Sequence, residues 1–198
     1  MKKLSFSLVK KLPSHEKKMT LSTLITLVRI ILIPFILTAM QSQYWGTALV
    51  LFIIAALTDV ADGTLARLRN ERTFLGACLD PIADKLLVLS CFFMLAFTKA
   101  PLFDIPGWFL ALIALRELIM IGGSLTVWVS TGSLVIRPTL LGKATTVLHM
   151  GFIAWVFACY YYHWLPIKTY YGMLGVGVVL VTISLGHYIY IGYKQLVP

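Results

Sequence analysis

Four aspartates stand in two closely spaced pairs within a chain that is otherwise mostly hydrocarbon. Asp59 and Asp62 are three residues apart, and Asp80 and Asp84 are four apart, so each pair would share one face of a helix. A charged side chain in membrane-grade sequence costs about 2.5–3.5 kcal/mol on insertion scales, which makes it a functional candidate. Four facing carboxylates in a medium of low dielectric cannot all stay ionised without cations. The two pairs therefore predict a cation site.

The ligand type indicates which cations the site would hold. Carboxylate oxygens are hard ligands that suit Mg²⁺ or Mn²⁺, and the sequence has no Cys or His cluster that would favour zinc. A two-metal site built from these aspartates would suit displacement at phosphorus, where it can stabilise the attacking and leaving oxygens. Two other interpretations use the same acids: a buried ion network without a substrate, and a proton- or cation-coupled transporter.

Two glycines and an arginine accompany the aspartates. Gly63 and Gly76 carry no side chain, so a bulky substrate such as a nucleotide could approach the backbone there. Arg67 would lie on the same helical face as Asp59, where its guanidinium could pair with a phosphate or a carboxylate. One arginine cannot neutralise four acids, which argues against an ion network that is purely structural.

The elements that must position these residues are membrane-spanning helices. Of the 198 residues, 59% are hydrophobic and 13% are charged, whereas a soluble domain has about 25% charged residues. The mean hydropathy is +0.88. The sequence predicts an all-α integral membrane protein in which one domain, residues 20–198, contains six transmembrane helices of about 20 residues each. The predicted spans are 20–41, 45–67, 79–98, 107–129, 142–163 and 169–191.

A short basic segment, residues 1–19, precedes the first predicted span. Its lysines alternate with apolar residues, which is typical of an amphipathic juxtamembrane segment on an anionic membrane face. A basic tail that only sets topology is the alternative. The net charge of +9 does not indicate a nucleic-acid partner, because the basic residues cluster at the ends of apolar segments.

The distribution of Lys and Arg predicts the orientation. An even number of spans places both termini on one side, and the positive-inside rule makes that side the cytoplasm. The two basic residues of the predicted outside loops are Lys99 and Lys168. The twelve of the inside loops are Lys2, Lys3, Lys10, Lys11, Lys17, Lys18, Arg67, Arg69, Arg72, Arg137, Lys143 and Lys194. The aspartates and the active site that they form are therefore expected at the cytoplasmic ends of the second and third helices.

The pattern D-x-x-D-G-x-x-A-R-(x8)-G-x-x-x-D-x-x-x-D over residues 59–84 resembles the full signature of the CDP-alcohol phosphatidyltransferase family. The resemblance implies an enzyme of phospholipid biosynthesis in the bacterial inner membrane. Such an enzyme transfers the phosphatidyl group of CDP-diacylglycerol to an alcohol, releases CMP and is usually a homodimer among membrane lipids. The resemblance also implies that Asp59, Asp62 and Asp80 are the principal metal ligands and that Asp84 is both a ligand and the general base. The positions implied for binding the CDP-lipid are Asp62, Gly63, Ala66, Arg67, Gly76 and Thr26.

The acceptor alcohol is predicted from weaker signs. Within the family the chain most resembles the bacterial phosphatidylglycerophosphate synthases, which implies sn-glycerol 3-phosphate as the acceptor. Thr26, Arg29 and the pair Arg116-Glu117 agree with that group. The element that starts at Gly142 carries Thr145 and His149 where that group usually carries Lys and Gln. The cardiolipin synthases of the same family, which use phosphatidylglycerol, and other members therefore stay open.

Charge gives a second argument about the acceptor. Glycerol 3-phosphate is a dianion, so its pocket needs cations beyond Arg67, and the candidates are Arg116, Arg137 and Lys143. The alternative is that Arg137 and Lys143 only set topology and that Arg116 pairs with its neighbour Glu117. Lys85 is expected to extend toward the membrane surface or to serve the site. His149 is interpreted as a hydrogen-bonded core histidine rather than a ligand.

Overall fold

A computed structural model describes residues 21–69, 74–98, 102–131 and 140–196, with side chains placed for 25–58, 82–98, 102–123, 142 and 144–190. Within these ranges the fold is all-helical, as predicted. The helices are α1 (Leu21–Gln41), α2 (Trp45–Arg69), α3 (Phe74–Phe97), α4 (Gly107–Thr131), α5 (Leu140–Tyr162) and α6 (Ile167–Leu196).

The third helix begins five residues earlier than the sequence predicted, at Phe74 rather than at residue 79. Gly76 therefore lies on α3 and not in the loop before it, and the connection from α2 spans only residues 70–73. Asp80 lies on α3, as predicted. The prediction placed the helix start close to Pro81. A proline inside a helix of a membrane protein is tolerated when its surroundings satisfy the freed carbonyl, so Pro81 does not end this helix.

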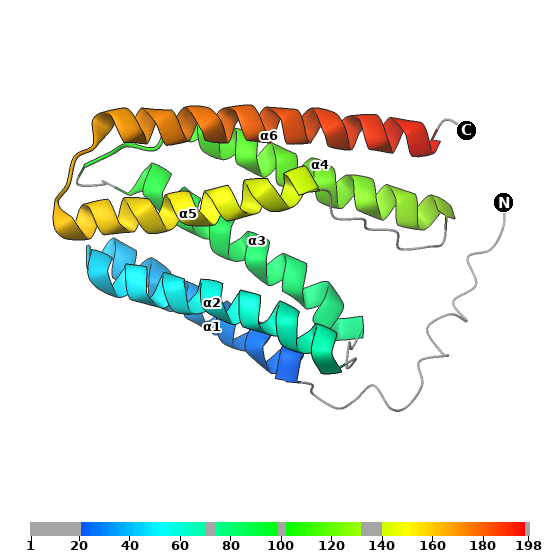
Figure 1. Cartoon of the computed structure of the whole chain (residues 1–198), viewed down its shortest axis with the longest axis horizontal. Helices are drawn as coiled ribbons and strands as arrows, with labels where there is room; N and C mark the ends of the chain where they lie inside the picture. The colour runs from blue at the N-terminus through cyan, green and yellow to red at the C-terminus, as the bar shows by residue number, and fades with distance from the viewer. Residues whose placement is uncertain (1–20, 70–73, 99–101, 132–139, 197–198) are drawn as a thin grey trace.

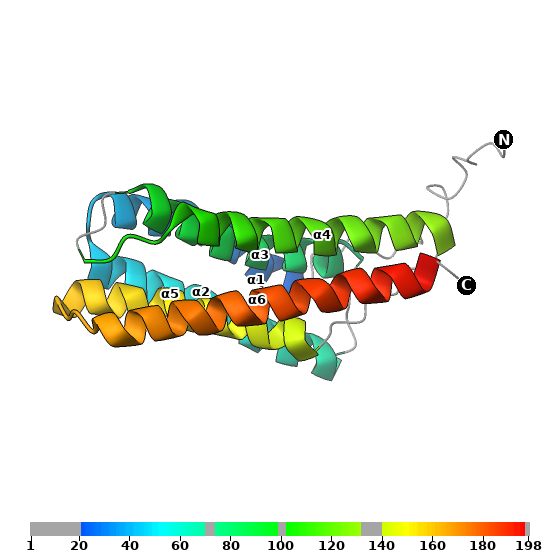
Figure 2. The ribbon, with the colours of Figure 1, turned by 90° about the horizontal axis from the view of Figure 1, so that it is seen from above.

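Consecutive helices run in opposite directions along a bundle (Figure 1). Helix α1 packs against both α2 and α3, and α5 packs against α2 and α6. Helix α4 lies beside α6, and Figure 2 shows these two running alongside each other. Because the number of helices in the described ranges is even, α1 begins and α6 ends at one end of the bundle. The carboxyl end of α2 and the start of α3 lie at this same end (Figure 1).

Aromatic side chains hold the opposite end of the bundle together. The Tyr160 hydroxyl donates a hydrogen bond of 2.8 Å to the carbonyl of Phe103, and the Tyr170 hydroxyl donates one of 3.0 Å to the carbonyl of Asp104. The rings of Phe103 and Tyr170 stack with their centroids 4.6 Å apart. The connection between α3 and α4 is thereby fastened to both α5 and α6 at this end.

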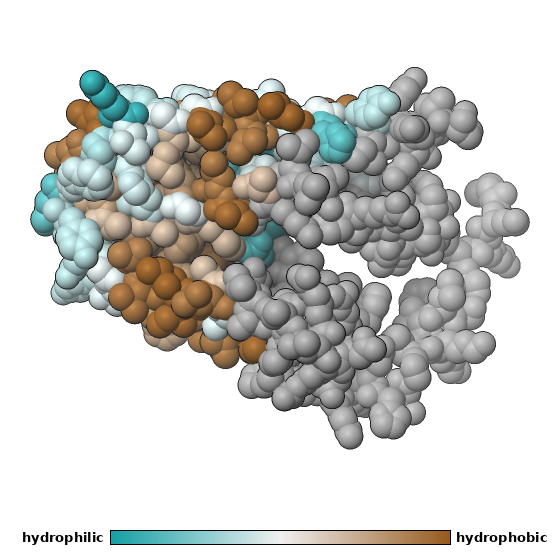
Figure 3. Space-filling model, in the orientation of Figure 1, coloured by the Kyte–Doolittle hydropathy of each residue, from teal (hydrophilic) through white to brown (hydrophobic). Residues whose placement is uncertain are grey.

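The described helices differ in how clearly they could cross a membrane. Two stretches are long and apolar enough to do so, Ala144–Tyr162 in α5 and Ile167–Tyr190 in α6. The described apolar stretches of α1 and α2, Ile25–Gln41 and Trp45–Thr58, are shorter. Large hydrophobic side chains are nevertheless exposed on several helices, and Figure 3 shows hydrophobic patches over α1, α2 and α6. Contiguous apolar surface of this kind is typical of a membrane or protein interface.

Gly177 lets α6 approach α4 and α5 closely. A Cβ atom at this position would lie 3.1 Å from Cζ of Phe109 and 3.7 Å from Cδ2 of Leu148. Because Phe109 is buried, its ring has little room to yield. We expect Gly177→Leu to lower the free energy of unfolding by about 1–3 kcal/mol through overpacking, measured by thermal unfolding in detergent.

Gly175 supplies the matched control for this substitution, because a Cβ atom there would meet nothing within 4 Å. We expect Gly175→Leu to change the free energy of unfolding by about 0.5 kcal/mol or less. Equal losses in the two variants would show that close packing at Gly177 is not what limits the substitution.

Candidate active site

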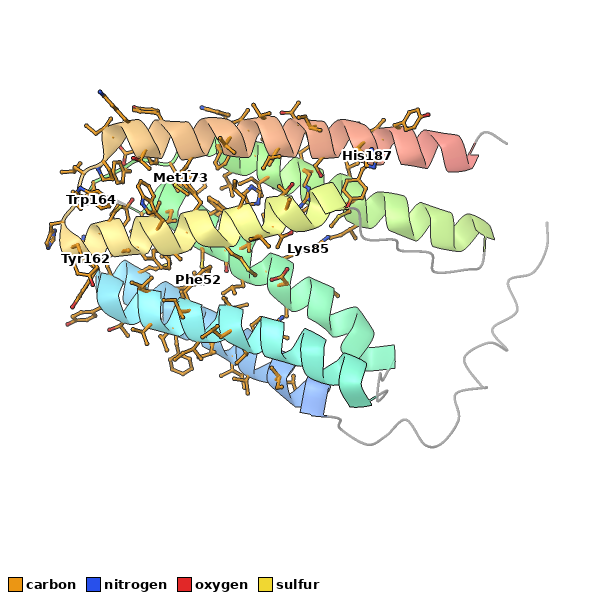
Figure 4. All side chains as sticks on the ribbon, viewed as in Figure 1. Phe52, Lys85, Tyr162, Trp164, Met173 and His187 are labelled. Atoms are coloured by element: carbon orange, nitrogen blue, oxygen red, sulfur yellow. The ribbon has the colours of Figure 1, made fainter. Side chains whose placement is uncertain are left out.

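A polar pocket lies between the middle of α3, the middle of α4 and the first turns of α5. It offers about 30 Å³ of space, which corresponds to room for about one or two water molecules. Lys85 marks its place in Figure 4. The polar and charged side chains that line it are Asp84, Lys85, Glu117, Thr146 and His149. Three helices that are distant in sequence thus bring two carboxylates, an ammonium, a hydroxyl and an imidazole to one place.

The carboxylate of Glu117 is shared by two cations. Its Oε2 lies 3.0 Å from Nζ of Lys85 on α3, and its Oε1 accepts a hydrogen bond from the guanidinium of Arg116. Arg116 is only 1% exposed. Since a buried charge is costly unless it is paired and hydrogen-bonded, Glu117 is the carboxylate that compensates the buried charge of Arg116. The shared carboxylate also holds Lys85 at the pocket.

The same arginine ties α4 to the last two helices. Its guanidinium donates to the carbonyl of Gly142 and to Oγ of Ser184, both at 3.4 Å, and lies 5.9 Å from the ring centroid of Tyr188. The ion pairs and these contacts form a network that joins α3, α4, α5 and α6. The network fixes the walls of the pocket.

Asp84 was predicted to be the catalytic residue, and the structure describes its side chain. It is half-buried on α3 and lines the pocket next to Lys85. A carboxylate at the wall of a small polar pocket, with an ammonium beside it, is suited to accept a proton from a bound hydroxyl. A small hydroxyl-bearing molecule in this pocket would lie beside Asp84.

The remaining predicted donor-site residues are placed only by their helices. The carboxyl-terminal half of α2 carries Asp59, Asp62, Gly63, Ala66 and Arg67, and the first turns of α3 carry Gly76 and Asp80. The side chains of the five that are not glycine lie outside the described part of the chain. Thr26 and Arg29 are buried on α1, which packs against both α2 and α3.

Of the three cations predicted to bind the acceptor, the structure describes the side chain of one, Arg116. Arg116 forms the ion pair with Glu117 that was the alternative to phosphate binding, and it does not line the pocket. Its role toward a phosphate stays a prediction. Lys143 lies in the first turn of α5 with its side chain outside the described residues, and Arg137 lies outside them altogether. The cation that the structure places at the pocket is Lys85.

Sequence reasoning missed most of the pocket wall. It left the role of Lys85 open, gave Thr146 no role and treated Glu117 only as a partner of Arg116. His149 is buried as predicted, at 2% exposure. The expected hydrogen bond is not seen at Nε2, which has no partner among the described residues. The departure from the family pattern at His149 was the signal that could have drawn attention to it.

The predicted metal site can be tested in part. Among the described side chains, no three of His, Cys, Asp or Glu lie close enough to hold a metal ion, so Asp84 would need ligands from the other aspartates. The four-residue connection between α2 and α3 brings the helical segments with those aspartates to the same end of the bundle (Figure 1). An all-oxygen donor set from these segments fits Mg²⁺ or Mn²⁺.

The sequence was compared with known protein families. The family described as CDP-alcohol phosphatidyltransferase matches residues 19–187. The chain belongs to this family. The match extends from just before α1 into the last part of α6, so it includes all five helices that contribute to the aspartate segments, the pocket and its ion network. It therefore confirms the resemblance predicted from residues 59–84.

Individual relatives agree with the family but divide over the acceptor. A protein of Salmonella choleraesuis named CDP-diacylglycerol–glycerol-3-phosphate 3-phosphatidyltransferase is 49% identical over 69 residues, 33% of this chain and 38% of that protein. A protein of the same name from Wigglesworthia glossinidia brevipalpis is 40% identical over 75 residues, 36% of this chain and 41% of that protein. A Mycobacterium tuberculosis H37Rv protein named "Putative cardiolipin synthase" is 28% identical over 136 residues. That match covers 67% of this chain and 62% of the mycobacterial protein.

Proposed function

We propose that this chain transfers the phosphatidyl group of CDP-diacylglycerol to sn-glycerol 3-phosphate, giving phosphatidylglycerophosphate and CMP. The observation that carries the reaction type is Asp84 at the wall of a polar pocket in a chain of this family. The choice of acceptor is supported by the names of the Salmonella and Wigglesworthia relatives, which are the more identical ones over shorter stretches.

In the proposed reaction the primary hydroxyl oxygen of the acceptor attacks the phosphorus that bears the diacylglycerol. The bond between this phosphorus and the oxygen of the CMP phosphate breaks, and its electron pair leaves with CMP. The proton of the hydroxyl passes to the carboxylate of Asp84. Lys85 adds a positive charge at the pocket for an anionic acceptor, beside the candidates proposed from sequence. These candidates are Arg116, Arg137 and Lys143.

The donor would lie along the α2 and α3 segments. Asp62, Gly63, Ala66, Arg67 and Gly76, with Thr26 from α1, are proposed to hold the cytidine and its phosphates. Asp59, Asp62, Asp80 and Asp84 would hold two Mg²⁺ or Mn²⁺ ions, whose charge would offset that of the pyrophosphate as CMP leaves.

We propose that the six helices are six spans of one domain, residues 20–198, preceded by the amphipathic segment 1–19. The two clear spans, α5 and α6, and the apolar surface of the other helices support this arrangement. Both termini and the pocket would face the cytoplasm of a bacterial inner membrane, where CDP-diacylglycerol and a soluble acceptor both arrive. A homodimer is proposed from the family resemblance alone.

The second candidate is a cardiolipin synthase that uses phosphatidylglycerol as the acceptor. The match to the mycobacterial protein favours it, because that match covers about twice as much of this chain as those to the two phosphatidyltransferases. A cation-coupled transporter is disfavoured by membership of a transferase family.

An acceptor screen separates these functions. We expect purified protein in mixed micelles with CDP-diacylglycerol to release CMP when sn-glycerol 3-phosphate and Mg²⁺ or Mn²⁺ are added, and at least about tenfold more slowly without the acceptor. Release that responds to phosphatidylglycerol instead would move the assignment to the cardiolipin synthases. Absence of CMP release with every acceptor tested, together with ion flux in liposomes, would contradict the enzyme.

A further inference from the structure

His149 lines the pocket and has a buried ring nitrogen without a hydrogen-bond partner among the described residues. Its side chain is 2% exposed, the nitrogen is Nε2, and Asp84 lines the same pocket. The imidazole is held in place by edge-to-face contacts with Phe92 and Phe109, at centroid distances of 5.5 and 6.3 Å. Leaving a buried polar atom without a partner is unfavourable, so an unpartnered nitrogen on a side chain that lines the pocket indicates a ligand that completes it.

Each of the other polar groups of the pocket already has a bonding partner or a proposed catalytic role, whereas Nε2 of His149 has no partner among the described residues and no proposed role. Lys85 and Glu117 pair with each other, and Thr146 donates its hydroxyl hydrogen to the carbonyl of Gly142 at 3.2 Å. Asp84 is the proposed base. His149 also does not form a metal-ligating cluster with the two carboxylates of the pocket, since no three such described side chains lie close enough. A small ligand that binds between α3 and α5 is therefore left as its partner.

The chemistry of the atom points to a hydroxyl group. Nε2 of a neutral imidazole either donates or accepts one hydrogen bond, depending on the tautomer, and a hydroxyl can serve both cases. An anion would require the donor form alone. The pocket offers about 30 Å³, which suits the slender end of an acyclic alcohol rather than a six-membered polyol ring.

Both proposed acceptors share such an end. Glycerol 3-phosphate and the headgroup of phosphatidylglycerol each terminate in a primary hydroxyl with a secondary hydroxyl on the next carbon. We infer that Nε2 of His149 binds this secondary hydroxyl, which places the primary hydroxyl at Asp84 for attack. The inference rests on the proposed function and makes His149 a specificity-determining residue for a terminal glycerol unit.

Acceptors without the secondary hydroxyl test this role in the full-length protein. 3-Hydroxypropyl phosphate replaces glycerol 3-phosphate, and phosphatidyl-1,3-propanediol replaces phosphatidylglycerol, so the two pairs also tell which source of the glycerol unit is used. We expect the wild type to prefer the hydroxylated member of the pair it uses by about 10- to 100-fold in kcat/KM. We expect His149→Leu to lower kcat/KM for that member by a similar factor and to change the deoxy member by less than about threefold.

Two further variants keep the test decisive. His149→Gln retains a side chain that can donate and accept, so it should keep most of the preference. His187→Gln is the matched control, since His187 is a half-buried helical histidine that does not line the pocket, and it should behave as the wild type.

Two results would overturn the inference while leaving the proposed function intact. One is that the wild type uses the deoxy acceptor as well as the hydroxylated one. This measurement does not depend on whether any variant folds. The other is a His149→Leu variant that slows both members of a pair equally, as a structural role predicts. Absence of acceptor-dependent CMP release from the wild type would instead overturn the proposed function itself, and the inference with it.

Discussion

Asp84→Asn is expected to slow acceptor-dependent CMP release by about 10²–10⁴-fold, the usual contribution of a general base. Asparagine keeps the size of the side chain at the half-buried pocket wall but cannot take up the proton of the attacking hydroxyl. Binding of CDP-diacylglycerol should persist, because the proposed donor contacts lie mainly on α2, α1 and the first turns of α3. CMP release and equilibrium binding of the CDP-lipid measure the two effects separately.

The matched control for Asp84→Asn is Asp104→Asn. Asp104 is exposed in the connection between α3 and α4 and does not line the pocket, so this variant should turn over as the wild type. A metal titration of both variants separates loss of the base from loss of a ligand, since a weaker ligand set would be rescued by more Mg²⁺. Near-normal turnover of Asp84→Asn at ordinary metal concentration would remove Asp84 from the role of base.

The second large effect is expected on stability. Glu117→Leu removes the carboxylate that Arg116 and Lys85 share, and it leaves the guanidinium of Arg116 buried without an opposite charge. Breaking a buried ion pair from one side typically costs about 3–5 kcal/mol. For a chain of this size we expect Tm in detergent to fall by roughly 6–20 °C.

A double variant distinguishes the ion pair from simple packing loss. In Arg116→Leu/Glu117→Leu both charges are gone, so much of the lost stability should return, as it does when buried ion pairs are replaced by apolar side chains. Lys85→Met should cost far less than Glu117→Leu, because Lys85 is partly exposed and Glu117 would still pair with Arg116. Additive losses in the double variant would contradict the network.

The helices and the aspartate motif were largely predictable because each depends on residues that are close together in the sequence. Apolar runs of span length gave each helix, with ends usually within a few residues of those found. The two largest differences were the start of α3, five residues earlier than predicted, and the end of α6, five residues later. The aspartate pattern over residues 59–84 was sufficient to predict the family, since its spacing needs no knowledge of packing.

The pocket could not be predicted in the same way. Which faces of α3, α4 and α5 meet depends on how whole helices rotate against each other, and that is decided by packing around residues such as Phe92, Phe109 and Phe152. Lys85 and His149 are separated by 64 positions and carry no shared motif, yet both line the pocket. Arg116 looked available for a phosphate because its burial by Ser184 and Gly142 comes from two later helices.

The adjacency of Arg116 and Glu117 has a consequence for biogenesis. In the proposed six-span arrangement α4 would be made before α5 and α6, so Gly142, Ser184 and Tyr188 could not yet contact Arg116 when α4 entered the bilayer. A lone arginine at the centre of an entering helix costs about 2.5–3.5 kcal/mol. The neighbouring carboxylate on the same helix neutralises that charge from the start. In that arrangement α4 would enter the membrane as a nearly neutral segment, and the later helices would pack on a charge that Glu117 already compensates.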